Sequence, residues 1–144
     1  MSAPLPTPYE AAGLVQAADR MHTAVRGASA WRYVAWLSGM AVATLMYFTG
    51  LGLLGEDDRG VGVLSIAFGL SIAVLSLTLL PGARVSSAGF ARRWAQAVLG
   101  WGVLYAAGML LGLMVFRGEL AFWLPAAVLA ALPLVLGARA EARA

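Results

Sequence analysis

Four long uncharged apolar segments set the strongest limit on how this 144-residue chain can fold. They contain no Asp, Glu, Lys, Arg or His and cover residues 33–54, 61–81, 94–116 and 120–138. A helix rises about 1.5 Å per residue, so about 20 such residues cross a hydrocarbon layer roughly 30 Å thick. Membrane strands would instead alternate apolar and polar residues. The sequence therefore predicts an all-α membrane protein with four transmembrane helices in a bundle.

The composition agrees with lipid as the main surroundings of the chain. Charged residues make up 12% of it, against about 25% in soluble domains. Cysteine is absent, which excludes a disulfide framework and any thiolate metal site. The net charge of +3 comes from arginines that flank the apolar segments. Because these arginines form no single patch, nucleic acid is not an expected partner.

The arginines also predict the orientation of the chain. If the four segments cross the membrane in turn, eight arginines fall on one side and two on the other. The first group is Arg20, Arg26, Arg32, Arg84, Arg92, Arg93, Arg139 and Arg143, and the second is Arg59 and Arg117. Positive charge is retained in the cytoplasm during insertion. We therefore expect a cytoplasmic tail over 1–30, a transmembrane domain over 31–138 and a cytoplasmic C-terminal tail over 139–144.

The N-terminal tail carries the pattern of an amphipathic helix over residues 8–26. The sequence TPYE at 7–10 has the residues of a helix N-cap, a first-turn proline and a capping box. An apolar stripe follows at helical spacing, formed by Leu14, Ala18, Met21 and Val25. Gly27 is expected to end this helix. The interpretation that we favour places it on the inner membrane surface, and the alternative packs it against a partner or a second copy.

The sequence GEDDRG at 55–60 holds three of the seven acidic residues of the chain. It lies between the first two apolar segments and is framed by glycines, as expected for a solvated turn of a helical hairpin. A weak external cation site is the alternative. A calcium loop would space its oxygen ligands at alternate positions and add a distal carboxylate, which this segment does not do.

Small residues recur at four-residue spacing in two of the apolar segments. Ser65, Gly69 and Ala73 form one stripe, and Gly108 and Gly112 form a GxxxG pair. Such stripes allow the backbones of membrane helices to approach closely. We expect all five residues to be helix-packing positions.

Ionisable side chains are absent from the apolar segments, and this limits the chemistry available there. Catalysis needs a base, a nucleophile or a metal within reach, so an enzyme is not expected, nor is a cofactor or metal site. The larger polar side chains are Trp101, Tyr105 and Gln96. We expect them to face other helices, with Thr44 or Ser71 as acceptors. The alternative is an apolar binding pocket around Trp101 and Tyr105.

A shift of 58 residues aligns 36–60 with 94–118 and gives six identities in 25 positions. The matched pairs are Trp36 and Trp94, Tyr47 and Tyr105, Gly50 and Gly108, Leu53 and Leu111, Arg59 and Arg117, and Gly60 and Gly118. The segments that follow do not match. The hypothesis is a parallel duplication of a helical hairpin, with a pseudo-twofold axis along the membrane normal.

The helical segment AAGLVQAADRMHTAVRG leads into the aromatic segment WRYVAW and then into four apolar spans. In this order of features the chain resembles small four-helix integral membrane proteins of high-GC Gram-positive bacteria. The resemblance implies a bacterial plasma membrane and no particular activity. The expected function is a non-enzymatic accessory or interaction subunit, assembled through small-residue helix faces as a homo-oligomer or with another membrane protein. The alternative is a small oligomeric carrier or channel subunit for an apolar or neutral solute.

Overall fold

The computed structural model describes residues 7–55, 57–79 and 90–143 of the chain. They form four helices in the order α1 (Pro8–Leu54), α2 (Asp58–Leu77), α3 (Phe90–Met114) and α4 (Leu120–Ala142). Each helix contains a stretch long and apolar enough to cross a membrane. The protein is therefore a multi-pass membrane protein with an all-helical bundle, as the sequence predicted. The second predicted segment reaches residue 81, but α2 ends at Leu77, and residues 80–89 lie outside the described part.

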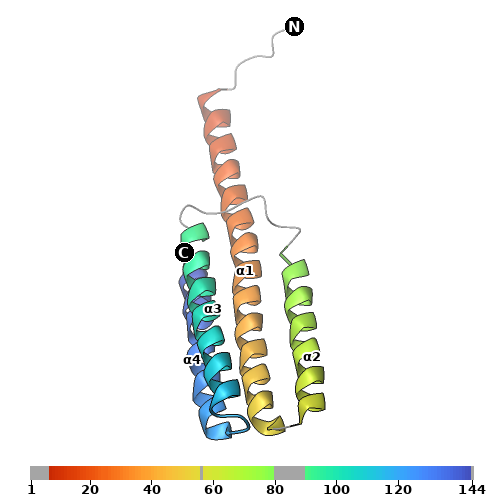
Figure 1. Ribbon diagram of the computed structural model, residues 1–144. Coiled ribbons are helices and arrows are strands. Elements are labelled where there is room, and N and C mark those ends of the chain that lie inside the picture. The colour runs from red at the N-terminus through yellow and green to blue at the C-terminus, as the bar shows by residue number, and fades with distance from the viewer. Residues whose placement is uncertain (1–6, 56, 80–89, 144) are drawn as a thin grey trace.

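The helices run alternately up and down, so their ends gather at two opposite ends of the bundle (Figure 1). One end holds the short connections after α1 and after α3, and we call it the turn end. The opposite end holds the end of α2, the start of α3 and the end of α4, and we call it the termini end. The first half of α1 extends beyond the bundle at the termini end.

α1 is one helix of 47 residues, which corrects the predicted helix end at Gly27. Its start was predicted correctly: Thr7 accepts a hydrogen bond from the Glu10 N–H, and the Glu10 carboxylate accepts from the Thr7 N–H at 2.8 Å. The Glu10 carboxylate also accepts a hydrogen bond from the Thr7 hydroxyl at 2.8 Å. The bond from the Thr7 backbone, and to a smaller extent the one from its hydroxyl, lowers the pKa of Glu10 below its usual value. A glycine inside a helix costs only about 1 kcal/mol, and the helix continues through Gly27 into the first span.

The continuity of α1 also bears on where the amphipathic segment lies. A helix that lies on the membrane surface must bend before it enters the bilayer. In Figure 1 the segment before the bundle instead continues in line with the span. We name residues 8–30 the arm of α1. The exposed apolar side chains of the described arm include Leu14, Val15 and Met21.

Both connections at the turn end depend on a glycine with positive φ. Gly55 has a φ of 59° and Gly118 has a φ of 76°, a region that other residues rarely adopt. A Cβ added to Gly118 would lie 3.0 Å from the Cα atom of Gly55. The two turns therefore touch, and a side chain at position 118 would press on the backbone of Gly55.

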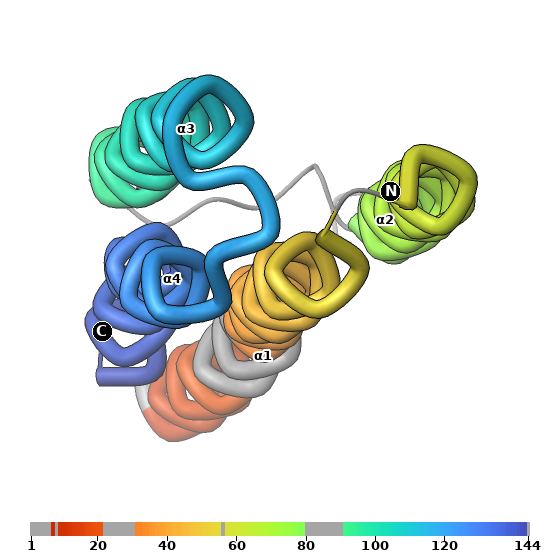
Figure 2. The backbone as a smooth tube through the Cα atoms, turned by 60° about the horizontal axis from the view of Figure 1, so that its bottom comes forward, coloured from red at the N-terminus to blue at the C-terminus, as the bar shows by residue number. Residues whose placement is uncertain are grey.

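The four helices do not surround one common axis. α1 packs along α4, and α4 packs along α3, whereas α2 packs along α1 alone (Figure 2). The buried side chains form two clusters along α1, one toward each end of the bundle. Of the 20 residues of α2, all of which the structure describes, none is buried.

This arrangement corrects the duplication hypothesis in one respect. A pseudo-twofold axis would give α2 and α3 the same packing as α4 and α1, but the backbones of α2 and α3 do not pack along each other. Two of the matched residue pairs nevertheless meet. The rings of Trp36 and Trp94 lie 5.9 Å apart, and those of Tyr47 and Tyr105 lie 6.3 Å apart. Matched residues of α1 and α3 thus contact each other, whereas the placement of α2 does not follow the proposed axis.

Candidate functional site

Aromatic rings bridge the space between α2 and α3 near the middle of the bundle. Phe68 of α2 stacks on Tyr47 of α1 at 4.4 Å, and it lies 5.9 Å from the parallel ring of Tyr105 of α3. Trp101 lies one turn from Tyr105, at 5.3 Å between ring centroids. Stacked and tilted pairs at these distances are attractive beyond the area that they bury. The pair formed by Phe68 and Tyr105 therefore joins α2 to α3.

The polar atoms of this aromatic cluster are bonded to neighbouring helices or to their own. The Trp101 Nε1–H donates to Thr44 Oγ1 at 3.0 Å, and the Thr44 hydroxyl donates to the Met40 carbonyl at 2.8 Å. The prediction that Thr44 accepts from α3 is therefore confirmed for Trp101. The Tyr47 hydroxyl bonds Ser65 Oγ of α2 at 3.0 Å. The other predicted acceptor, Ser71, is exposed and donates to the carbonyl of Ala67.

Gln96 does not belong to this cluster, although the sequence suggested that it faces another helix. The structure places it on the exposed side of α3, next to the buried Ala97. Its position near the termini end lets the amide reach the polar edge of a membrane without a protein partner. The pocket alternative around Trp101 and Tyr105 stays a prediction.

The GxxxG pair of α3 packs against large rings of α1 and α4. A Cβ on Gly108 would lie 2.8 Å from Cε1 of Phe48, and one on Gly112 would overlap the indole of Trp123. Both residues are thus helix-packing positions, as predicted.

The stripe of α2 behaves differently from the pair in α3. Ser65 is partly buried and bonded to Tyr47, but Gly69 and Ala73 are exposed, and a Cβ added to Gly69 would meet no atom within 4 Å. Only Ser65 therefore packs within the chain. Successive residues four apart advance by about 40° around a helix, so the stripe turns away from α1 as it runs along α2.

An ion pair that the sequence did not suggest closes the termini end between α3 and α4. Arg93 Nε lies 3.2 Å from the Oε2 atom of Glu141. Glu141 is 6% exposed and belongs to α4, because this helix continues to Ala142 instead of ending at residue 138. The predicted free tail over 139–144 is therefore mostly helix. The signal was present in the sequence as the spacing of Ala138 and Glu141, which lie on one face of a continued helix.

Two buried indole groups lie at the same end. Trp36 is 7% exposed and its ring contacts that of Trp94. Both Nε1–H groups are buried, and neither has a hydrogen-bond partner among the residues described. An unsatisfied buried donor costs about 1–3 kcal/mol. The sequence places these residues near the starts of the first and third apolar segments and matches them in the repeat, but it does not predict that they are unsatisfied.

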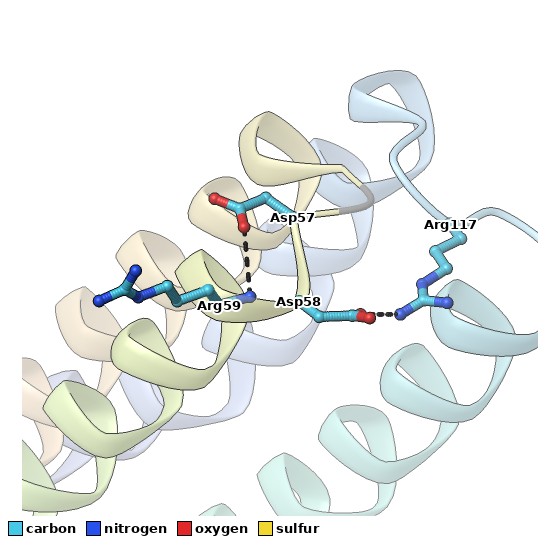
Figure 3. A network of polar contacts seen from close by, with 4 residues as sticks. All are labelled: Asp57, Asp58, Arg59 and Arg117. Carbon is cyan, nitrogen blue, oxygen red and sulfur yellow. Dashed lines mark hydrogen bonds and ion pairs between the residues drawn. The ribbon is translucent and has the colours of Figure 1, made fainter.

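The acidic turn at 55–60 is occupied by internal bonds (Figure 3). Asp57 accepts from the Arg59 backbone N–H at 3.2 Å and so caps α2, while Asp58 pairs with Arg117 of the second turn at 2.6 Å. Glu56 lies outside the described residues. The two carboxylates point to different partners, as a capped and solvated turn requires. In the described ranges 7–55, 57–79 and 90–143, no three His, Cys, Asp or Glu residues gather as a metal site would need.

No protein-family model, no curated protein and no solved structure matches this chain.

Proposed function

We propose that this protein is a non-enzymatic integral membrane subunit that acts by binding another membrane-spanning chain through α2. The observation that carries the proposal is that none of the 20 described residues of α2 is buried. A helix of a self-sufficient bundle covers one face against its neighbours, whereas the backbone of α2 packs along α1 alone and α2 reaches α3 through the Phe68 ring.

The exposed side of α2 has the shape that membrane helices use to associate. Gly62, Ile66, Gly69 and Ala73 follow one another at spacings of four, three and four residues, and no atom lies within 4 Å of where a Cβ would stand on either glycine. Without side chains there, a second helix can approach the backbone closely and gain van der Waals contact. The partner is a second copy of the chain or another membrane protein.

The arm of α1 supports the same proposal. It extends beyond the bundle and presents Leu14, Val15 and Met21, each more than half exposed. Exposed apolar side chains on a helix outside the membrane are typical of a surface that another helix covers. The arm and α2 would then contribute two separate contacts to one assembly.

A catalytic role has less support from the interior of the bundle. The buried hydroxyl of Thr44 is bonded to the Met40 carbonyl and to Trp101, and the hydroxyl of Ser65 is bonded to the Val61 carbonyl and to Tyr47. A nucleophile needs an adjacent base, and the spans contain none. A carrier would need polar groups along a path, and these two hydroxyls are engaged within the helices. The geometry therefore favours binding over transport or catalysis.

The location that we propose is the bacterial plasma membrane, with the termini end in the cytoplasm. The placement of arginines supports this orientation, since Arg59 and Arg117 are at the turn end. The described helices place five arginines of the larger group at the termini end: Arg32, Arg92, Arg93, Arg139 and Arg143. The arm of α1 would then lie in the cytoplasm.

Cysteine cross-linking tests the role of α2, because the chain has no cysteine of its own. Gly69→Cys and Ala73→Cys place a thiol on the proposed face, and Val74→Cys, which is 61% exposed on another side of α2, is the matched control. Mild oxidation or a short bifunctional reagent in native membranes should cross-link the first two variants and not the control. The mass of the product identifies a second copy or another chain. Equal yields from all three positions would contradict the proposal.

A further inference from the structure

Trp36 and Trp94 differ from the other interior tryptophans of the chain. The Trp101 N–H donates to Thr44, and the Trp123 N–H donates to the Phe116 carbonyl at 3.2 Å. The Nε1 atoms of Trp36 and Trp94 each expose less than 1 Å² and have no acceptor within the described ranges. The fold thus satisfies the indoles of Trp101 and Trp123 and leaves a contacting pair unsatisfied, with ring centroids 5.9 Å apart. This pair points to an acceptor that the described residues do not supply.

The missing partner can be specified chemically. An indole N–H only donates, so each nitrogen requires an acceptor oxygen. The two rings lie near the first residues of two spans, Trp31–Leu54 and Ala91–Met114, where a membrane changes from hydrocarbon to headgroups. A phospholipid brings phosphate and ester oxygens to this depth on a single molecule. It can therefore serve two neighbouring donors at once.

The charges around the pair favour an anionic lipid. Arg32 is one turn before Trp36 and is exposed, and Arg93 directly precedes Trp94. Glu141 engages Arg93 through Nε, and the Arg93 side chain remains 35% exposed. Arg92 and Arg139 are exposed at the same end, so the arginines outnumber the one carboxylate. Basic groups between helices at a headgroup level are typical of anionic lipid sites.

We propose that Trp36 and Trp94 form a binding site for one anionic phospholipid, whose phosphate or glycerol ester oxygens accept from both indoles beside Arg93. The nitrogens are covered in the described conformation, so binding requires a local displacement. Leu75 and Leu79, at the end of α2, pack on the core cluster that contains Trp36. Because the backbone of α2 packs along α1 alone, a displacement of its last turn would break contacts mainly with one helix.

NMR of the indole N–H groups tests this site in the full chain. The protein is reconstituted into nanodiscs of phosphatidylcholine alone or of phosphatidylcholine with phosphatidylglycerol, and Trp→Phe variants assign the signals. Phosphatidylglycerol should shift the Trp36 and Trp94 N–H protons downfield, as new hydrogen bonds do. The signals of Trp101 and Trp123 should stay unchanged, since their bonds lie inside the chain. Inorganic phosphate added to the phosphatidylcholine nanodiscs should shift none of the four indole N–H signals.

Several results would overturn the proposal. An equal shift with phosphatidylcholine alone would show that no anionic lipid is required, and an equal shift with inorganic phosphate would assign the site to a free anion. Unshifted signals in every lipid would mean that no lipid reaches the pair.

Native mass spectrometry gives a second readout. The Trp36→Phe/Trp94→Phe variant should retain about tenfold less phosphatidylglycerol, while Trp101→Phe should retain as much as the unaltered chain. Equal retention of phosphatidylglycerol by the double variant and by Trp101→Phe would contradict the proposed site. If the double variant does not insert, the spectra of the unaltered chain still decide.

Discussion

At the residue scale, the interior is built from rings that pack against glycines. Phe48 of α1 lies against Gly108, Trp123 of α4 lies against Gly112, and the ring of Pro133 would lie 3.3 Å from a Cβ on Gly100. A ring against a bare backbone brings many atoms into contact without a gap, which is the main source of stability where lipid is as apolar as the side chains. All three glycines lie on α3, so added volume at these positions should disturb its contacts with α1 and α4.

Gly112→Ala should destabilise the protein by about 1–3 kcal/mol, because the new methyl group overlaps the indole of Trp123 and the ring must move. The matched control is Gly102→Ala in the same helix. Gly102 has no atom within 4 Å of a Cβ position, so this change should leave stability unaltered or raise it by up to about 1 kcal/mol. Unfolding in mixed micelles with increasing dodecyl sulfate measures both. Similar losses from the two variants would mean that the close approach at Gly112 does not matter.

The sequence predicts part of this residue-scale packing. It predicts Gly108 and Gly112 as packing positions and names Thr44 or Ser71 as acceptors; the structure places both glycines against rings and shows Thr44 as the acceptor for Trp101. Its prediction for Gln96 is wrong, and Gly69 and Ala73 do not pack within the chain. Spacing shows which residues share a helix face, but a span that is apolar all round does not show which face has a neighbour.

At the element scale, α1 is the longest helix, and it joins the arm to the first apolar span. Its arm and its span would be separate helices if Gly27 ended the first one, as the sequence suggests. The observed helix has no such break, since one glycine removes little from a cooperative helix that is already extended on both sides. The capping box at Thr7 was the stronger sequence signal because it involves specific hydrogen bonds.

Spin labels at Val15→Cys and Val42→Cys measure whether the arm stays in line with the span. Both residues are exposed, at 61% and 55%. A continuous helix separates the two positions by 27 residues and therefore by about 40 Å, whereas a right-angle bend at Gly27 would bring them to about 29 Å. Pulsed electron–electron resonance in nanodiscs should give one narrow distribution near the longer value. A distribution centred on the shorter distance would show that the helix bends and that the arm lies along the membrane surface.

At the scale of the whole molecule, one ion pair ties each end of the bundle. Arg93 and Glu141 join α3 to α4 at the termini end, and Asp58 and Arg117 join the start of α2 to the second turn. Both partners at the turn end are exposed, whereas Glu141 is buried. The two pairs therefore have similar chemistry and different surroundings.

Glu141→Gln should lower the stability by about 1–3 kcal/mol, because it removes a charged partner from a largely buried hydrogen bond. Asp58→Asn should lower it by less than about 1 kcal/mol, as is usual for exposed pairs. Thermal unfolding in detergent at low and at high salt compares them, and salt should reduce the effect of Asp58→Asn further. A larger loss from Asp58→Asn would mean that the tie at the turn end, and not the one at the termini end, holds the bundle together.

The sequence predicts the number of spans but not how they are arranged. Length and the absence of charge define four spans, and the structure has four helices that can cross a membrane. The position of α2 outside the contact between α1, α3 and α4 has no counterpart in the sequence. Matched residues such as Trp36 and Trp94 suggest a symmetric pair of hairpins, yet the residues that would place α2 and α4 alike do not repeat.

Because α1 is one continuous helix, a tilt of its span also moves the arm. About 35 Å of helix lies between the tip of the arm and the first residues of the span. A tilt of about 10° in the bilayer would carry the tip sideways by about 6 Å at constant helix geometry. Changes in bilayer thickness that tilt the span would therefore be transmitted to the far tip of the arm as displacement, with no unfolding in between.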